Sequence, residues 1–216
     1  MLKWQQDSIQ IFHEVMNKAE DLWNQIKPVF DKYDLSSAKA ELEQLDAVGG
    51  EGPEDVRSDQ WRYYWWLPSL VRTIRPAQIV ELGGAWGVGA LMILSELSKE
   101  SKLYSTTLPE EPAFKYIRKD YPNLIKLIGD HLDLDIWPKD IDLKKTDIWF
   151  IDSNHTASQL RKELELYTPF FKPRAILLFD DIHIDPAFYA VWLELPFDKY
   201  DASVLHIPSG FGIAVI

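Results

Sequence analysis

The chain has 216 residues, with 34 acidic and 23 basic side chains and a formal charge of −11. This acidic balance, without a basic stripe, argues against binding to nucleic acid or to an anionic membrane. The absence of cysteine excludes disulfides, zinc–thiolate sites and a thiol nucleophile. No apolar run reaches the ~20 residues of a membrane-spanning helix. We therefore expect a soluble, cytoplasmic protein with one domain of ordinary size and an appendage.

The first 58 residues predict a helical extension, followed by the main domain at 59–216. Apolar residues recur at three- and four-residue spacing between 9 and 23, and a second helical pattern covers 36–45. Glycines at 49–53 then predict a flexible joint. The next expected helix, 61–74, is so aromatic (WRYYWWLPSLV) that it should pack on the sheet or on a second subunit, which is compatible with a homodimer.

From residue 78 onward, short apolar runs alternate with helical patterns. This alternation is typical of an α/β fold with a doubly wound, mostly parallel sheet. The last sixteen residues contain two apolar runs around Pro208–Gly210, which predict a C-terminal antiparallel hairpin and bring the sheet to seven strands. The other expected strands are 78–82, 102–106, 125–128, 147–151 and 175–179, and the expected helices are 88–99, 111–120, 156–170 and 186–195.

A glycine-rich turn follows the first strand of this sheet. Glu81, Gly83, Gly87 and Gly89 stand between a buried strand and a helix. Glycines there let backbone N–H groups approach a ligand, and the start of the helix favours an anionic group. The spacing does not fit the dinucleotide fingerprint, which weakens nicotinamide and flavin cofactors.

This segment resembles motif I of the class I S-adenosylmethionine-dependent methyltransferases, as Glu81-x-Gly83-x-Ala85-x-Gly87-x-Gly89. Ala85 stands where that family usually has its middle glycine. The resemblance extends from about Trp61 to the C-terminus, because the terminal hairpin is the feature that separates this fold from other doubly wound sheets. It implies S-adenosylmethionine as cofactor, with contacts from Glu81, Gly83, Gly84, Ala85, Trp86, Gly87, Thr107, Asp130 and Asp152.

Two of these positions differ in how closely they match the family. Asp130, in the segment LIGDH, corresponds to the acid that faces the adenine amino group. At the end of the second strand, where the family has an acid for the ribose hydroxyls, this chain has Thr107, with Glu110 three residues later. Either the threonine hydroxyl takes this bond, or Glu110 reaches back, or the affinity for the cofactor is reduced.

Three acids follow the fourth and fifth strands, in WFIDSNH and LLFDDIH. We expect Asp152, Asp180 and Asp181 at the carboxyl edge of the sheet, where open α/β folds bind ligands. Adjacent strands are ~4.8 Å apart, so the carboxylates should repel one another unless a cation lies between them. An oxygen-only site selects magnesium, calcium or manganese.

The same residues resemble the metal-dependent O-methyltransferases of the catechol and macrolide-sugar types. That resemblance implies Asp152, Asp180 and Asp181 as ligands of Mg²⁺ or another hard divalent ion, and His155 as the general base. His183 is a second candidate for the base, or a residue behind the ligands. Two alternatives remain: Asp152 or its neighbours cap the helix at 156–170, or Asp180 contacts substrate without an ion.

The expected function is transfer of a methyl group from S-adenosylmethionine to a hydroxyl of a small molecule, with a catechol, sugar or polyol favoured because vicinal oxygens chelate an ion. One rival is a metal-independent N- or carboxyl-methyltransferase. The other is a non-catalytic binding or regulatory protein of the same fold, which Ala85 and Thr107 favour.

Overall fold

The computed structural model describes residues 19–33, 38, 41, 43, 60–110 and 113–216. Several predictions on the N-terminal extension lie outside these residues. They are residues 9–18 of the helix expected at 9–23, the glycine-rich joint at 49–53, the boundary between 58 and 59, and most of the second helical pattern at 36–45.

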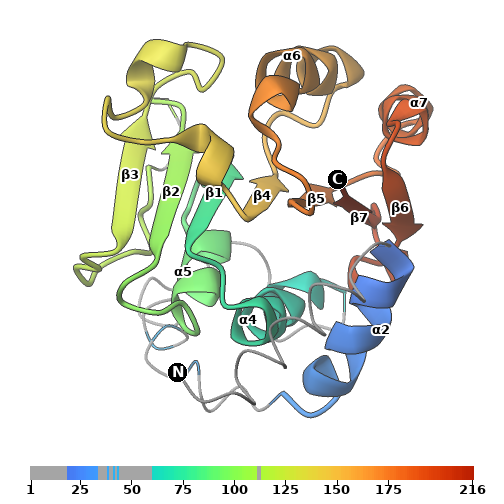
Figure 1. Cartoon of the computed structure of the whole chain (residues 1–216), viewed down its shortest axis with the longest axis horizontal. Helices are drawn as coiled ribbons and strands as arrows, with labels where there is room; N and C mark the ends of the chain where they lie inside the picture. Colours follow the sequence, from blue (N-terminus) through green and yellow to red (C-terminus); the bar gives the residue numbers. More distant parts are fainter. Residues whose placement is uncertain (1–18, 34–37, 39–40, 42, 44–59, 111–112) are drawn as a thin grey trace.

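A seven-stranded sheet in the order β3-β2-β1-β4-β5-β7-β6 forms the centre of the molecule (Figure 1). The first five strands are parallel, and β7 runs antiparallel between β5 and β6. This confirms the predicted sheet and its antiparallel end. The strands are β1 Gln78–Leu82, β2 Lys102–Thr107, β3 Leu124–Ile128, β4 Ile148–Ile151, β5 Ile176–Asp180, β6 Asp198–Asp201 and β7 Phe211–Val215.

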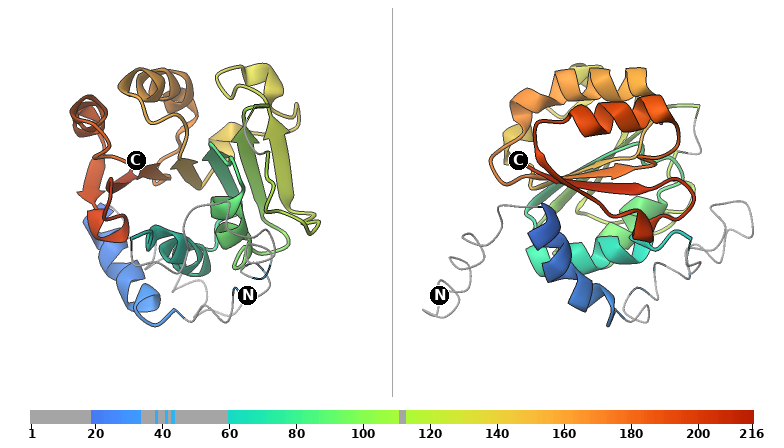
Figure 2. Two further views of the ribbon diagram at one scale, coloured as in Figure 1. Left: turned by 180° about the vertical axis from the view of Figure 1, so that it is seen from behind. Right: turned by 90° about the vertical axis from the view of Figure 1, so that its right-hand side faces the viewer.

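Helices cover both faces of the sheet (Figure 2). One face carries α2 Ala19–Phe30, α4 Tyr63–Ile74 and α5 Val88–Leu94, and the other carries α6 Ala157–Tyr167 and α7 Pro186–Glu194. Short 3₁₀ helices occupy Leu134–Ile136, Leu143–Lys145, Thr168–Phe170 and Ser203–Leu205. None of the helices in the described part of the chain has the length and apolar character needed to cross a membrane.

The two long helices after β4 and β5 begin at side-chain caps. Thr156 accepts a bond from the backbone N–H of Gln159 at the start of α6. Asp185 accepts bonds from two backbone N–H groups at the start of α7, and Pro186 follows it at a position where a proline fits a helix. The alternative that Asp152 or its neighbours cap the helix after β4 is therefore wrong, because Thr156 does so.

The central strands are buried on both faces, which explains their continuous apolar sequences. Along β4, Phe150 packs with the cluster under α4 and α5, whereas Trp149 packs with the cluster under α6 and α7. Leu178 and Leu177 of β5 divide in the same way. Each central strand thus joins two apolar layers.

Two local predictions are wrong. The helix expected at 111–120 does not form over its described residues, 113–120, which run as turns and bends. Phe114 and Tyr116 donate backbone bonds to the carbonyls of Ala85 and Trp86, so the segment is shaped by the glycine-rich turn. The second difference lies in the hairpin: its first strand is 198–201, and residues 202–210 form a longer connection than the turn expected at Pro208–Gly210.

An aromatic cluster joins the last strand to α4. Phe211 of β7 is fully buried, and its ring lies 5.2 Å from Tyr63, 5.9 Å from Trp66 and 6.3 Å from Phe150 between ring centroids. This cluster therefore holds α4 against the antiparallel end of the sheet.

We expect Phe211→Ala to lower the free energy of unfolding by about 3–5 kcal/mol, because truncating a buried phenylalanine leaves a cavity among packed rings. Urea denaturation measures this change. The control is Ile207→Ala, which alters a largely exposed side chain and should change stability by no more than about 0.5 kcal/mol. Equal effects in the two variants would contradict the packing argument.

One carboxyl group, that of Glu81, lies inside the central strand β1. The residue is 1 % exposed, and it accepts a hydrogen bond from the Ser105 hydroxyl of β2. Burial raises the pKa of Glu81 to about 7, although the Ser105 bond opposes the shift.

Since this folded-state pKa lies above the unfolded value of 4.5, the folded protein binds more protons between these two pH values. Raising the pH through that window therefore removes about 3 kcal/mol of stability in the ligand-free protein. Glu81→Gln cannot ionise, so its stability relative to wild type should rise by about 3 kcal/mol between pH 4 and pH 8. Urea unfolding of both proteins across this range tests the prediction, and a constant difference would contradict it.

Candidate active site

A cavity of about 1110 Å³ opens at the carboxyl ends of the parallel strands. Its position next to β1 and β4 is where the strand order reverses, which is the usual ligand site of an open α/β sheet. The turn after β1, the ends of β2 and β3, the segments after β4 and β5, the start of α4 and the connection before β7 all contribute to its wall. The lining includes Trp61, Tyr63, Tyr64, Glu81, Gly83, Gly84, Ala85, Trp86, Thr107, Asp130, His131, Asp152, Ser153, His155, Gln159, Asp180, Asp181, Ile184, His206 and Ser209.

The glycine-rich turn forms one wall of this cavity. The N–H groups of Gly83 and Gly84 both donate to the Thr106 carbonyl, which holds the turn against β2. Gly83 has φ +98°, and a Cβ built there would lie 1.8 Å from the carbonyl oxygen of Asp152. Only glycine fits this position, because the backbone after β1 lies directly against the backbone after β4.

The predicted cofactor residues gather on this cavity, with one exception. Gly87 is outside the lining and instead precedes α5 in the left-handed conformation, at φ +89°. Ala85 also has a left-handed φ, +34°. This conformation is unfavourable for alanine and would not be for the glycine that the family usually has there. The predicted residues that line the cavity are Glu81, Gly83, Gly84, Ala85, Trp86, Thr107, Asp130 and Asp152.

Thr107 and Glu110, the alternatives at the end of β2, differ in position. Thr107 lines the cavity and is 3 % exposed, and its Oγ1 has no hydrogen-bond partner among the residues that the structure describes. Glu110 is not part of the lining. A buried hydroxyl without a partner is costly unless a ligand satisfies it, so this wall fits a ligand with a hydrogen-bonding group at this position.

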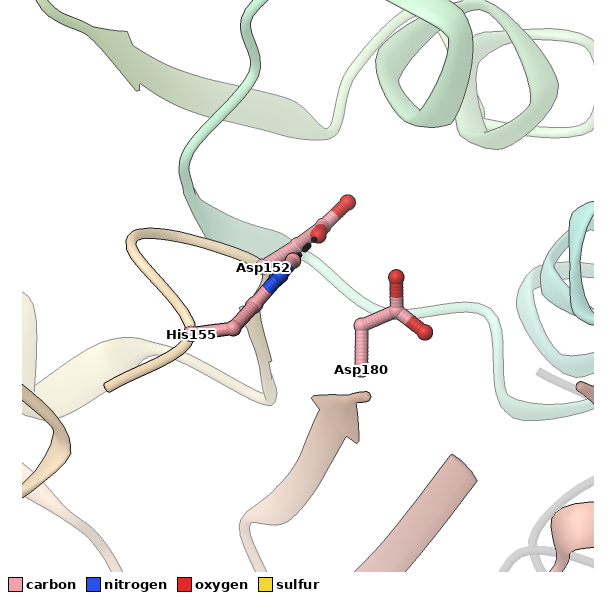
Figure 3. Close-up of side chains that lie close together, drawn as sticks. All are labelled: Asp152, His155 and Asp180. Atoms are coloured by element: carbon pink, nitrogen blue, oxygen red, sulfur yellow. Dashed lines mark hydrogen bonds and ion pairs between the residues drawn. The ribbon is translucent and has the colours of Figure 1, made fainter. Parts of the chain in front are cut away.

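The opposite wall carries the acids predicted after β4 and β5. Asp152 follows β4, Asp180 is the last residue of β5, and Asp181 comes directly after it. His155 lies between two of them: its Nε2 is 3.1 Å from Asp152 Oδ1, and its Nδ1 is 2.6 Å from Asp181 Oδ2. Figure 3 shows His155 beside Asp152, with Asp180 at the tip of its strand.

A second histidine, His206, completes this group from the connection before β7. Its Nδ1 is 2.8 Å from Asp180 Oδ1 and 3.4 Å from Asp181 Oδ1. The sequence does not identify His206 as a site residue, because a single histidine far along the chain carries no signal of its neighbours. We call Asp152, His155, Asp180, Asp181 and His206 the acid–histidine cluster.

His183, the second candidate base, lies elsewhere. Its Nε2 is 2.7 Å from Asp201 Oδ2, its ring packs on Tyr189, and it does not line the cavity. The structure therefore separates it from the cluster.

Electrostatics within the cluster follow from burial and from these pairs. Burial raises the pKa of Asp152 well above its usual range, and the charge of Asp180 adds to the shift. Burial acts in the same direction on Asp181, but His155, Ser209 and His206 outweigh it and lower the pKa of that carboxyl. Burial also opposes protonation of His155, yet its bonds to Asp152 and Asp181 raise the pKa of the imidazole to about 11. In the ion-free molecule His155 is therefore a cation at neutral pH.

The cluster has the donor atoms of a metal site. Ligand-capable atoms of Asp152, His155 and Asp180 lie within 4.8 Å of one another, and so do those of Asp180, Asp181 and His206. Three carboxyl groups and two imidazoles thus meet in a largely buried place. A divalent cation fits this donor set.

Aromatic side chains from the start of α4 complete the cavity. Trp61, Tyr63 and Tyr64 line it, whereas Trp66 is wholly buried in the core. Burial raises the pKa of both tyrosines well above the usual range, and the charges of Asp180 and Asp152 add to the shifts. Their hydroxyls therefore keep their protons at neutral pH and can donate hydrogen bonds.

Known proteins resemble this chain in sequence and in fold. A family model described as "Methyltransferase domain" matches residues 80–182. A search of curated proteins gave no significant match.

Several solved structures have the same fold. The O-methyltransferase from Bacillus cereus in complex with SAH is 18 % identical, with a TM-score of 0.59 over 86 % of this chain and 92 % of that one. The SAH-bound methyltransferase PaMTH1 from Podospora anserina is also 18 % identical, with a TM-score of 0.58 over 81 % and 86 %. The O-methyltransferase TomG from Streptomyces achromogenes, in complex with SAM, is 14 % identical, with a TM-score of 0.55 over 100 % and 99 %.

These solved structures are similar to the chain in fold. The family model covers the glycine-rich turn and the acids after β4 and β5. Residues 80–182 thus match a methyltransferase domain, and the fold of the chain is that of the class I S-adenosylmethionine-dependent methyltransferases.

Proposed function

We propose that this methyltransferase transfers the methyl group of S-adenosylmethionine to a hydroxyl oxygen of a small molecule, assisted by a divalent metal ion. The observation that carries the proposal is that the glycine-rich turn and the acid–histidine cluster line one cavity of about 1110 Å³. The names of the Bacillus cereus and Streptomyces achromogenes proteins, both O-methyltransferases, support oxygen as the acceptor atom.

The turn after β1 would hold the cofactor. Its buried carboxyl, Glu81, and the backbone of Gly83 and Gly84 face the cavity. Thr107 would bind a ribose hydroxyl with the Oγ1 that has no partner among the described residues. Asp130, which lines the cavity after β3, would accept a bond from the adenine amino group.

The acid–histidine cluster would serve the methyl acceptor. Asp152, Asp180 and Asp181 would hold the ion, which when bound lowers the pKa of an acceptor hydroxyl and orients it. Two vicinal oxygens suit such a site, so a catechol, a sugar or a polyol is the proposed acceptor. Tyr63 and Tyr64 would position the acceptor with their hydroxyls, which stay protonated at neutral pH.

The reaction is an in-line displacement at the methyl carbon. The acceptor oxygen forms a bond to this carbon while the carbon–sulfur bond breaks, and the sulfonium leaves as a neutral thioether. The hydroxyl proton goes to His155. The bonds to Asp152 and Asp181 raise the pKa of this imidazole. A second positive charge beside those carboxylates would lower the pKa again, and His155 acts as a base under that condition.

Asp180→Ala should lower divalent-ion-dependent turnover by at least about 100-fold, since a Lewis acid contributes several kcal/mol to the transition state. Cofactor binding measured by calorimetry should stay close to wild type, because Asp180 and the glycine-rich turn form different walls. The matched control is Asp201→Ala, an aspartate outside the cavity lining.

Wild-type turnover in Asp180→Ala, or after exhaustive chelation, would favour the metal-independent rival. Absence of heat with S-adenosylmethionine would favour the non-catalytic one.

His155→Ala should lower turnover by about 100-fold or more near pH 7, because no base then takes the proton of the substrate hydroxyl. Activity should recover in part at high pH, where the acceptor hydroxyl ionises without help. A pH–rate profile of the ion-loaded protein measures both effects. His183→Ala serves as the comparison, and a larger loss in that variant than in His155→Ala would move the base to His183.

A further inference from the structure

We propose that His206 is itself a ligand of the metal ion, so that the site has a nitrogen donor and prefers a first-row transition ion over Mg²⁺. This inference rests on the proposed function, because it concerns the ion expected in the acid–histidine cluster. The geometry behind it is the single imidazole nitrogen that faces two carboxylates, 2.8 Å from Asp180 and 3.4 Å from Asp181.

The backbone fixes His206 on both sides. The N–H of His206 donates to the Ser203 carbonyl, and its own carbonyl accepts from Gly210. An isolated bridge pairs it with Trp61, next to the bond from the Ile207 N–H to the Gln60 carbonyl. These backbone bonds keep the imidazole of His206 beside Asp180 and Asp181.

The far side of the His206 ring also has the arrangement that a metal-bound histidine needs. With Nδ1 directed at the ion, Nε2 carries the proton and needs an acceptor. The hydroxyl oxygen of Ser209 lies 3.5 Å from Nε2, and this hydroxyl donates its own proton to Asp181. The serine therefore lies between two of the proposed ligands and offers Nε2 an acceptor.

His155 is a poorer nitrogen ligand than His206. Both of its ring nitrogens already contact carboxylates, Asp152 on one side and Asp181 on the other. Its side chain is 25 % exposed, against 5 % for His206. A more open imidazole suits proton transfer to and from an acceptor, and the buried one suits ligation. The two histidines thus divide the roles.

A mixed set of carboxylates and imidazole changes the preferred ion. Oxygen-only sites suit magnesium and calcium, whereas an imidazole raises affinity for iron, cobalt, nickel and zinc, following the general order of first-row metals. Asp180, Asp181 and His206 are all buried, yet all three line the cavity. An ion held by them would keep open positions for an acceptor's oxygens.

The test is metal binding to the full chain, with Co²⁺ and Mg²⁺ as titrants and His206→Asn as the variant. Asparagine keeps a donor to Asp180 but removes the imidazole nitrogen. The Co²⁺ affinity should fall by at least about 100-fold, because even residues behind a metal ligand typically contribute 10- to 100-fold, while Mg²⁺ affinity changes little. His183→Asn is the matched control and should bind both ions as wild type does. An unchanged ratio of Co²⁺ to Mg²⁺ affinity in His206→Asn would overturn the inference.

A spectroscopic readout separates this inference from the proposed function. Mn²⁺ bound to the wild type should show electron spin-echo modulation from a directly coordinated nitrogen, lost in His206→Asn and retained in His155→Gln and His183→Asn. Modulation that survives in His206→Asn and is lost in His155→Gln would assign the nitrogen to His155 and overturn the inference. Bound Mn²⁺ without nitrogen modulation would overturn it while leaving the metal site intact. Failure of the wild type to bind any of these ions would overturn the metal part of the proposed function as well.

Discussion

Like charges held at fixed positions by the sheet determine the chemistry of this end of the molecule. Asp180 is the last residue of β5 and pairs with Phe211 of β7, while the N–H of Asp152 is bonded to the Leu82 carbonyl at the end of β1. The backbone therefore cannot separate the two side chains without breaking the sheet. In a buried place their repulsion is strong, because little water screens it.

Two imidazoles from different parts of the chain lie between these carboxyl groups and reduce the repulsion. His155 comes from the segment after β4 and His206 from the connection before β7. Each of the three carboxyl groups therefore has an imidazole as a neighbour. The S-adenosylmethionine that we propose as methyl donor carries a positive charge at sulfur, and carboxyl groups opposite the glycine-rich turn would favour its binding in one orientation.

Features that depend on short stretches of sequence were predictable. The apolar runs predict the parallel strands, because a strand buried on both faces has an apolar sequence whatever its neighbours are. The acids after β4 and β5 were predictable as a group, since parallel strands end at one edge. The helix expected at 111–120 failed because hydrogen bonds from Phe114 and Tyr116 to the glycine-rich turn override its local preference. His206 could not be predicted, because its approach to Asp180 depends on an antiparallel strand whose connection is nine residues long, from 202 to 210.

The short backbone pairing between 60–61 and 206–207 has a consequence for the mobility of the cavity wall. It joins the residues before α4, which carry part of the aromatic wall, to the segment that supports His206. A movement that separated these two segments would break their backbone bonds and free the His206 backbone on one side. The position of the aromatic wall and the position of this imidazole are therefore coupled.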